Sequence, residues 1–190
     1  MKIILNEIKT KSNLLSMVRI LLAIPLWYLI DNFQSDQFRY FAAITCLVAS
    51  ATDILDGYLA RKFNEVTELG KIIDPLADKV VIGVVIIKLF LIGEIQMFYF
   101  LMIICRDLLI FIGGIVIAKK IGRVLPSNML GKITVSNIGI VILLIILNVN
   151  KDNFFFYALF ILSIILMATS LIGYAIRANE FIKRKDYGTI

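Results

Sequence analysis

The sequence predicts an all-α polytopic membrane protein with six transmembrane helices and with both termini in the cytoplasm. The first reason is composition: 60% of the 190 residues are hydrophobic, only 18% are charged, and the mean hydropathy is +0.92. Soluble domains, by comparison, average about a quarter charged residues. The second reason is that apolar runs long enough to cross a hydrocarbon core of about 30 Å recur along the chain. The third is that basic residues gather in alternate connections, which indicates the orientation.

The expected spans run from Asn13 to Ile30, Phe38 to about Ala60, Ile72 to Gly93, Met97 to Ala118, Gly131 to Val149 and Phe154 to about Ile176. Backbone polar groups inside lipid must be hydrogen-bonded within the protein, and the alternation typical of a β-barrel is absent, so we expect helices. We find neither a separate soluble domain nor an internal repeat. The sequence therefore predicts one integral-membrane domain over residues 1–190.

The first three runs differ in their polar residues. The first follows basic residues, as a signal peptide would, but it contains Arg19 and lacks a clear cleavage site, so we expect it to be retained. The second passes directly into a stretch rich in aspartate. The third begins in that stretch and carries Lys88 in its outer half, where the ammonium is expected to snorkel outward. Gly83 here, and Gly113–Gly114 in the fourth run, are expected to serve helix packing.

The last three runs carry candidate functional cations. The fourth holds Arg106 near its middle, followed by Asp107. An arginine inside the membrane is a candidate functional residue, and the competing interpretation is an ion pair, either with Asp107 or between helices. Lys132 opens the fifth run and Arg177 closes the sixth. Membrane topology alone also favours basic residues at these two positions.

The orientation follows from the basic residues of the connections. Four segments are rich in basic residues: they contain Lys2, Lys9 and Lys11 at the N-terminus, Arg61, Lys62 and Lys71 in the second connection, Lys119, Lys120, Arg123 and Lys132 around the fourth, and Lys183, Arg184 and Lys185 in the tail. The other connections hold little beyond Arg39 and Lys151. Both termini and the even connections are thus expected in the cytoplasm, which requires an even number of spans. The net charge of +6 suits anionic membrane lipids better than nucleic acid.

Four aspartates stand where the second and third runs meet. On a helix, Asp53 and Asp56 share one face because they are three residues apart, and Asp74 and Asp78 share a face at four-residue spacing. The short connection predicts antiparallel neighbours with all four carboxylates at one cytoplasmic end. Carboxylates crowded near a membrane interior are costly unless a cation joins them. Because the chain has no histidine, the oxygen-only ligand set favours Mg²⁺ or Mn²⁺.

This stretch has two other interpretations. Any one of the aspartates could be an ordinary carboxylate at the end of a loop, solvated or paired with Arg61, Lys71 or Lys79. That explanation is poor for four aspartates on two helix faces. Gly57 and Ala60 leave a notch beside Asp53 and Asp56 where a ligand could approach the backbone. Small residues at such spacing also let membrane helices pack closely, so the notch alone does not indicate a ligand.

These residues together form a motif that resembles a known family. The stretch reads Asp53-x2-Asp56-Gly57-x2-Ala60-Arg61-x8-Gly70-x3-Asp74-x3-Asp78. It is similar to the signature of the CDP-alcohol phosphotransferases, which are integral-membrane enzymes of phospholipid synthesis. The resemblance implies two divalent ions bound by Asp53, Asp56, Asp74 and Asp78. It also implies that Asp78 is the general base that deprotonates the acceptor hydroxyl. Contacts to the CDP part of the donor are implied for Asp53, Asp56, Gly57, Ala60, Arg61 and Gly70. A homodimer is implied by the resemblance alone.

The wider sequence bears on the acceptor alcohol. The segments "NLLSMVRILLAIPL" and "VASATDILDGYLAR" resemble bacterial phosphatidylglycerophosphate synthases, which join CDP-diacylglycerol to glycerol 3-phosphate and release CMP. This resemblance implies a place in the bacterial cytoplasmic membrane, with the active site on its cytoplasmic side. An anionic acceptor needs cationic partners, and Arg106, Lys132 and Arg177 are the candidates for its phosphate.

Two alternatives remain open. The segments "CRDLLI" and "VLPSNMLGK" look closer to the CMP-forming cardiolipin synthases of the same superfamily, whose acceptor is phosphatidylglycerol. A metal-ion transporter is the alternative from a different class, because acids within the membrane also mark ion paths. A transporter would place acids from more than one pair of spans near the midplane of the membrane. In this chain they gather at one predicted end.

Overall fold

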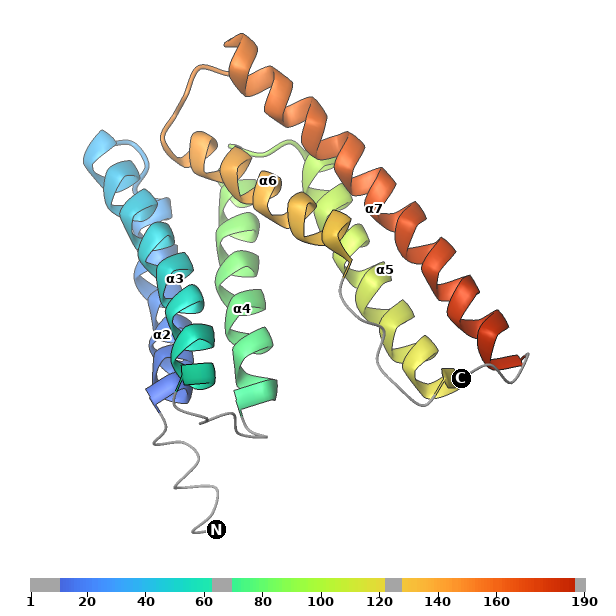
Figure 1. The fold of residues 1–190 in the computed structure, drawn as a ribbon. Coiled ribbons are helices and arrows are strands. Elements are labelled where there is room, and N and C mark those ends of the chain that lie inside the picture. Colours follow the sequence, from blue (N-terminus) through green and yellow to red (C-terminus); the bar gives the residue numbers. More distant parts are fainter. Residues whose placement is uncertain (1–10, 63–69, 122–127, 187–190) are drawn as a thin grey trace. The chain divides into compact units, whose positions relative to one another are not determined.

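The structure is a computed structural model that describes residues 11–62, 70–121 and 128–186, with side chains at 14–56, 62, 76–119 and 128–182. Within these ranges the chain forms six helices: α2 (Lys11–Asp31), α3 (Asp36–Lys62), α4 (Gly70–Leu91), α5 (Met97–Ile121), α6 (Met129–Ile146) and α7 (Phe154–Asp186) (Figure 1). The described parts contain no strand. The all-α prediction is confirmed for these residues.

Five of the described helices are long and apolar enough to cross a membrane. The candidate spans are Leu14–Asp31, Asp36–Asp56, Met97–Lys119, Met129–Ile146 and Phe154–Ile182. Helix α4 is not among them, although it is 22 residues long, because Asp74, Asp78, Lys79 and Lys88 interrupt its apolar sequence. The chain is therefore an integral membrane protein with five candidate spans. A sixth crossing by α4 stays a prediction.

The helix boundaries agree with the expected spans to within three residues, except at the end of α7. Helix α4 stops at Leu91, and Gly93 follows with a φ of 79°, so that the amide of Glu94 can donate to Leu89 O at 2.9 Å. Helix α6 stops at Ile146, before the expected Val149, because Asn148 turns into the left-handed region with a φ of 55°. Helix α7 continues past Ile176 to Asp186. The sequence places no glycine or proline after Ile176 until Gly188, so no residue breaks the helix earlier.

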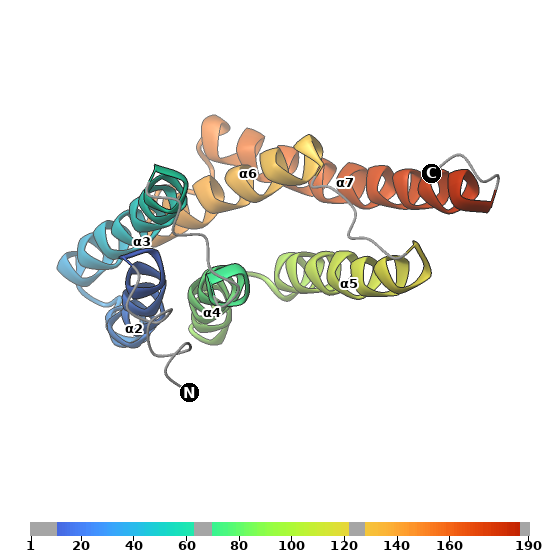
Figure 2. The ribbon, with the colours of Figure 1, turned by 60° about the horizontal axis from the view of Figure 1, so that its bottom comes forward.

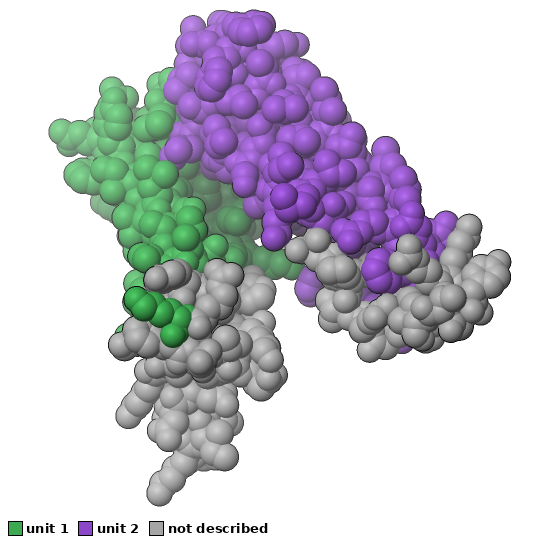
Figure 3. Space-filling view, in the orientation of Figure 1, with its two compact units in different colours: residues 1–95, 146–148 green, residues 96–145, 149–190 purple. Residues whose placement is uncertain are grey.

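The chain divides into two compact units, which Figure 3 colours separately. Unit 1 comprises Met1–Ile95 and Ile146–Asn148, and unit 2 comprises Gln96–Ile145 and Val149–Ile190. In unit 1, α2 packs along both α3 and α4, whereas α3 and α4 touch each other little. Figure 2 views this unit from the end where α2 begins and α3 ends. Leu26 and Ile30 of α2, Ala42 of α3 and Leu89 of α4 are completely buried in its core.

In unit 2, α5 packs against α7 with polar contacts along the seam. The hydroxyls of Tyr99 and Ser163 are hydrogen-bonded at 2.9 Å. A Cβ added at Gly113 would lie 3.2 Å from Tyr174 Cε1, and one added at Gly114 would lie 3.3 Å from Tyr174 Oη. The packing role predicted for these two glycines is confirmed. No atom of the described chain lies within 4 Å of a Cβ added at Gly83, so a packing role for this glycine stays a prediction.

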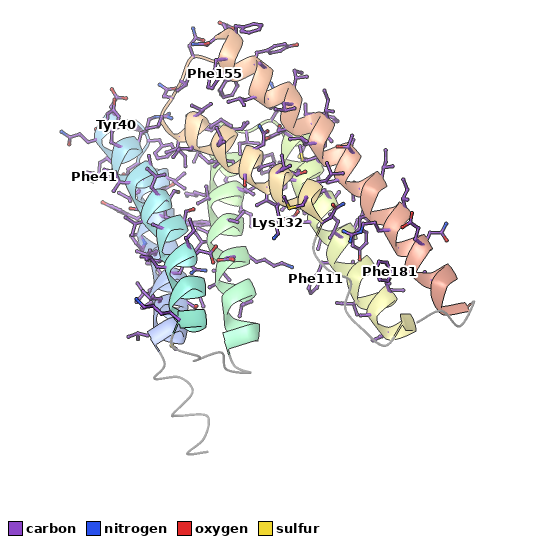
Figure 4. All side chains as sticks on the ribbon, in the orientation of Figure 1. Tyr40, Phe41, Phe111, Lys132, Phe155 and Phe181 are labelled. Atoms are coloured by element: carbon purple, nitrogen blue, oxygen red, sulfur yellow. The ribbon has the colours of Figure 1, made fainter. Side chains whose placement is uncertain are left out.

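Large apolar side chains cover the outside of the helices. Tyr40 and Phe41 on α3 are 61% and 58% exposed, and Phe155 on α7 is 61% exposed. Their side chains point outward in Figure 4. Exposure of apolar surface on this scale is unfavourable in water, but it matches a hydrocarbon solvent.

Lys88 corrects another sequence prediction. Its side chain does not snorkel outward, because the residue is only 7% exposed. The ammonium lies 2.5 Å from Asp31 Oδ1 and 4.5 Å from the centre of the Trp27 ring, so it joins α4 to α2. Near this end of the unit, Arg39 of α3 pairs with Glu94. An ion pair inside the unit thus satisfies the charge of Lys88, which the sequence predicted to extend outward.

Candidate active site

Three of the four motif aspartates converge on one arginine. Arg19 of α2 donates from Nη1 to Asp53 Oδ1 at 2.9 Å. The same nitrogen also donates to Asp78 Oδ1, and Nη2 donates to Asp56 Oδ2. Ser16, one turn earlier on α2, donates to Asp56 Oδ2 at 3.2 Å. Three helices therefore contribute side chains to a single polar cluster.

Helix geometry explains why these residues meet. Asp53 and Asp56 lie three residues apart on α3, so both carboxylates project from one face. Ser16 and Arg19 have the same spacing on α2. Because α2 packs along both α3 and α4, its arginine can reach Asp53 and Asp56 on one side and Asp78 on the other. The prediction that α3 and α4 present their carboxylates to a common place is borne out for these three aspartates.

The cluster is buried on one side and open on the other. Arg19 is 2% exposed and Asp56 is 3% exposed. In contrast, the side chains of Asp53 and Asp78 are 48% and 38% exposed. A polar ligand arriving from outside would therefore meet Asp53 and Asp78 first, with Asp56 behind them.

The charges in the cluster are unequal. One guanidinium faces three carboxylates, which leaves two negative charges unbalanced within this group. Arg19 Nε is buried and has no hydrogen-bond partner among the described residues. A buried donor in that position costs about 1–3 kcal/mol. The arginine therefore provides charge to the cluster without satisfying all of its own hydrogen-bonding groups.

The donor set fits a hard divalent cation. Carboxylate oxygens are the ligands that Mg²⁺ and Mn²⁺ prefer, and the excess negative charge favours a cation. Among the described side chains, however, no group of three or more acids, cysteines or histidines surrounds a common metal position. The Arg19 guanidinium lies among the carboxylates instead.

Several predicted site residues lie outside the described side chains. Asp74 and Gly70 belong to the first turns of α4, and Gly57, Ala60 and Arg61 to the last turns of α3, but only their place in these helices is described. Their assignments as metal ligand and nucleotide contacts stay predictions.

Arg19 and Ser16 are the residues of the cluster that sequence reasoning missed. Arg19 served there only as an argument against a signal peptide. The signal in the sequence was a charged residue inside a span, with a serine one turn before it. Such residues are costly in the membrane and need partners.

The three candidate acceptor residues belong to unit 2, whereas the aspartates belong to unit 1. Arg106 is 6% exposed and donates from Nη1 to Asp107 Oδ1 at 2.6 Å, so the competing interpretation of an ion pair is what the structure shows. It also donates to Ser170 Oγ at 3.3 Å and to Gly131 O at 3.5 Å. Lys132, labelled in Figure 4, is exposed, and Arg177 is half-buried.

The contacts of Arg106 reach the two helices that carry Lys132 and Arg177. Gly131, which accepts a hydrogen bond from Arg106, directly precedes Lys132 on α6. Ser170, its other partner, lies two helical turns before Arg177 and on the same side of α7. Binding of the acceptor phosphate by these three residues stays a prediction.

Sequence comparison assigns the family of this helical membrane protein. The profile of the CDP-alcohol phosphatidyltransferase family matches residues 9–174, so the chain belongs to this family.

Individual relatives agree with this assignment. A protein of Aquifex aeolicus is 33% identical over 178 residues, which cover 90% of this chain and 96% of the relative. A protein of Rickettsia bellii is 41% identical over 52% of this chain and 54% of its own length. A protein of Bacillus subtilis is 42% identical over 48% of this chain and 47% of its own length. All three are named CDP-diacylglycerol–glycerol-3-phosphate 3-phosphatidyltransferase. The chain spans about half the length of the Rickettsia and Bacillus relatives that it matches.

Proposed function

We propose that this chain transfers the phosphatidyl group of CDP-diacylglycerol to glycerol 3-phosphate, forming phosphatidylglycerophosphate and CMP. The observation that carries the proposal is the convergence of Asp53, Asp56 and Asp78 from two helices in a chain of this family. The shared name of relatives at 33% to 42% identity supports the choice of acceptor.

Asp53, Asp56, Asp74 and Asp78 would hold two divalent ions, Mg²⁺ or Mn²⁺. When bound, such ions neutralise the diphosphate of the donor and the charge that develops on the departing CMP. The unbalanced negative charge of the described cluster supports this assignment. Gly57, Ala60, Arg61 and Gly70, with Asp53 and Asp56, contact the CDP part of the donor.

Asp78 acts as the general base. The acceptor oxygen forms a bond to the phosphorus of the phosphatidyl group, the P–O bond to CMP breaks, and CMP leaves with the electron pair. The carboxylate of Asp78 accepts the proton of the attacking hydroxyl. A carboxylate is a weak base for an alcohol, so proton transfer accompanies P–O bond formation. The partial exposure of Asp78 supports this role, because the acceptor can reach it from outside the cluster.

Arg106, Lys132 and Arg177 bind the phosphate of glycerol 3-phosphate through charge-assisted hydrogen bonds. A second candidate acceptor is phosphatidylglycerol, which would make the chain a CMP-forming cardiolipin synthase. The segments "CRDLLI" and "VLPSNMLGK" favour that alternative.

The proposed enzyme crosses the bacterial cytoplasmic membrane six times, with both termini and the aspartate cluster at the cytoplasmic side, and it works as a homodimer. The basic residues of the alternate connections support the orientation. A metal-ion transporter is disfavoured because the three described site aspartates belong to one cluster rather than to a series of positions along a path.

An acceptor panel tests the function. Purified protein is supplied with CDP-diacylglycerol and with Mg²⁺ or Mn²⁺, and CMP release is measured with glycerol 3-phosphate, phosphatidylglycerol, inositol phosphate or serine. We expect release with glycerol 3-phosphate, and none from Asp78→Asn, although that variant should still bind CDP. Release with phosphatidylglycerol alone would identify a cardiolipin synthase. Failure to release CMP with every acceptor and both ions would disprove the enzyme assignment.

The same assay examines the acceptor residues. Lys132→Gln and Arg177→Gln should each raise the KM for glycerol 3-phosphate about tenfold while changing kcat less, since each removes a charged hydrogen bond to the acceptor. Lys151→Gln is the matched control, because Lys151 is an exposed lysine in the connection before α7. Equal KM values in all three variants would remove Lys132 and Arg177 from the acceptor site.

A further inference from the structure

Arg19 occupies the centre of the aspartate cluster. Its guanidinium bonds to carboxylates from two different helices, Asp53 and Asp56 of α3 and Asp78 of α4. The arginine itself comes from a third helix, α2, and only 2% of it is exposed. Without this cation, the three carboxylates would repel one another across the interface of α2, α3 and α4.

A divalent ion would take over the electrostatic role that Arg19 performs in this arrangement. Both are cations that join carboxylates of α3 and α4. The guanidinium that bonds to Asp56 Oδ2 and Asp78 Oδ1 places a positive charge beside the lone pairs with which these oxygens would ligate an ion. Binding of an ion by these oxygens is therefore opposed by repulsion between the two cations.

The guanidinium is held by charge more than by a complete set of hydrogen bonds. Its Nε is buried without a partner among the described residues. Buried polar groups are normally hydrogen-bonded, so an orphaned donor in a functional cluster calls for an explanation. The orphaned donor is explained if the Arg19 side chain has a second position, which it adopts when the carboxylates bind an ion.

We propose that Arg19 is a resident counter-cation of the aspartate cluster: it holds α2, α3 and α4 together in the metal-free protein and competes with divalent ions for the carboxylates. Arg19 is thus a positioning residue that sets the affinity for the ion. This inference rests on the proposed metal-binding role of the aspartates.

The proposal is tested by measuring Mn²⁺ binding to the purified full-length protein without donor or acceptor. The electron paramagnetic resonance signal of the free ion reports how much Mn²⁺ is bound. Arg19→Gln removes the charge and keeps a polar side chain. We expect Arg19→Gln to bind Mn²⁺ about tenfold more tightly than the unmodified protein, because a competing cation in contact with the ligands is gone. In EDTA the variant should melt at a lower temperature, and saturating Mn²⁺ should restore it.

Arg39→Gln is the matched control. Arg39 is also an arginine of unit 1 that pairs with an acid, Glu94, and its side chain is 11% exposed. It lies on α3 fourteen residues before Asp53, which is about 21 Å along a helix. Arg39→Gln should lower the melting temperature with and without Mn²⁺ alike and should leave the Mn²⁺ affinity unchanged.

Equal or weaker Mn²⁺ binding by Arg19→Gln than by the unmodified protein would overturn the inference. If Arg19→Gln does not fold, Arg19→Lys decides: its ammonium lacks the planar fork with which the guanidinium spans carboxylates of two helices, so Mn²⁺ should bind about threefold more tightly. Unchanged or weaker binding by Arg19→Lys would then refute competition. No Mn²⁺ binding by the unmodified protein would overturn this inference and the proposed metal role together. CMP release by Arg19→Gln, with the same Mn²⁺ affinity as the unmodified protein, would overturn this inference alone.

Discussion

At the scale of single residues, burial divides the described aspartates into two kinds. Asp56 is buried with Arg19 and accepts a hydrogen bond from Ser16, whereas about half of the Asp53 side chain is exposed. A buried charge that loses its partner is strongly destabilising, while a pair exposed to solvent contributes little. Residues with the same proposed function should therefore differ in their contribution to stability.

Asp56→Asn should lower the free energy of unfolding in EDTA by about 3 kcal/mol, because it leaves the buried Arg19 with only its two more exposed carboxylate partners. Asp53→Asn should lower it by less than about 1 kcal/mol. Unfolding by dodecyl sulphate in mixed micelles, followed by circular dichroism, measures both. Equal losses would show that the difference in burial does not decide stability at this cluster.

At the scale of helices, α2 organises unit 1 and the contact of α5 with α7 organises unit 2. Gly113 and Gly114 allow Tyr174 of α7 to approach α5, and they meet different atoms of its side chain. Gly113 faces the ring carbon Cε1, and Gly114 faces the hydroxyl oxygen. That oxygen is buried without a hydrogen-bond partner among the described residues, so Tyr174→Phe should itself cost little.

A double-mutant cycle separates the two contacts. Tyr174→Phe removes the oxygen that a Cβ at position 114 would crowd, so Gly114→Ala and Tyr174→Phe should couple favourably by about 0.5–1 kcal/mol. Gly113→Ala should show almost no coupling with Tyr174→Phe, because Cε1 remains in phenylalanine. Unfolding in mixed micelles gives both values. The result does not depend on how much helix propensity each alanine adds, since that contribution cancels in the cycle.

At the scale of the whole molecule, the question is whether α4 crosses the membrane. Five described helices qualify as candidate spans, and with five alone the two termini would lie on opposite sides. Helix α4 has the length to cross, and it is uncharged between Lys79 and Lys88. Lys88 near one end is buried against Asp31 and Trp27 rather than exposed, which lowers the cost of placing it in the membrane.

Reporter fusions decide this topology. If α4 crosses, alkaline phosphatase fused after Glu94 or after Lys151 should be active outside the cytoplasm, and green fluorescent protein fused after Ile190 should fluoresce inside it. If α4 does not cross, fusions at all three positions should give the opposite signal. A fusion after Asn32, which precedes α4, should report the outside in both cases and serves as the control.

Much of this protein could be predicted from its sequence. The spans followed from the length of the apolar runs, because only helices satisfy the backbone in lipid. Asp53, Asp56 and Asp78 could be assigned to one cluster, because helix periodicity fixes which residues share a face. The direction of Lys88 could not be obtained in this way, since it depends on partners distant in sequence. The later end of α7 was predictable, because no glycine or proline follows Ile176 until Gly188.

The sequence by itself determined that this protein lies in a membrane, that it is helical and that it carries the aspartate motif. Each of these depends on composition or on spacing within one helix. The tertiary structure decided which cation the carboxylates meet. Arg19 lies 34 residues from Asp53 and 59 from Asp78, and it reaches both only because α2 packs along α3 and α4. Helix periodicity reveals which groups share a face, whereas the partner of a charge is chosen by packing between helices.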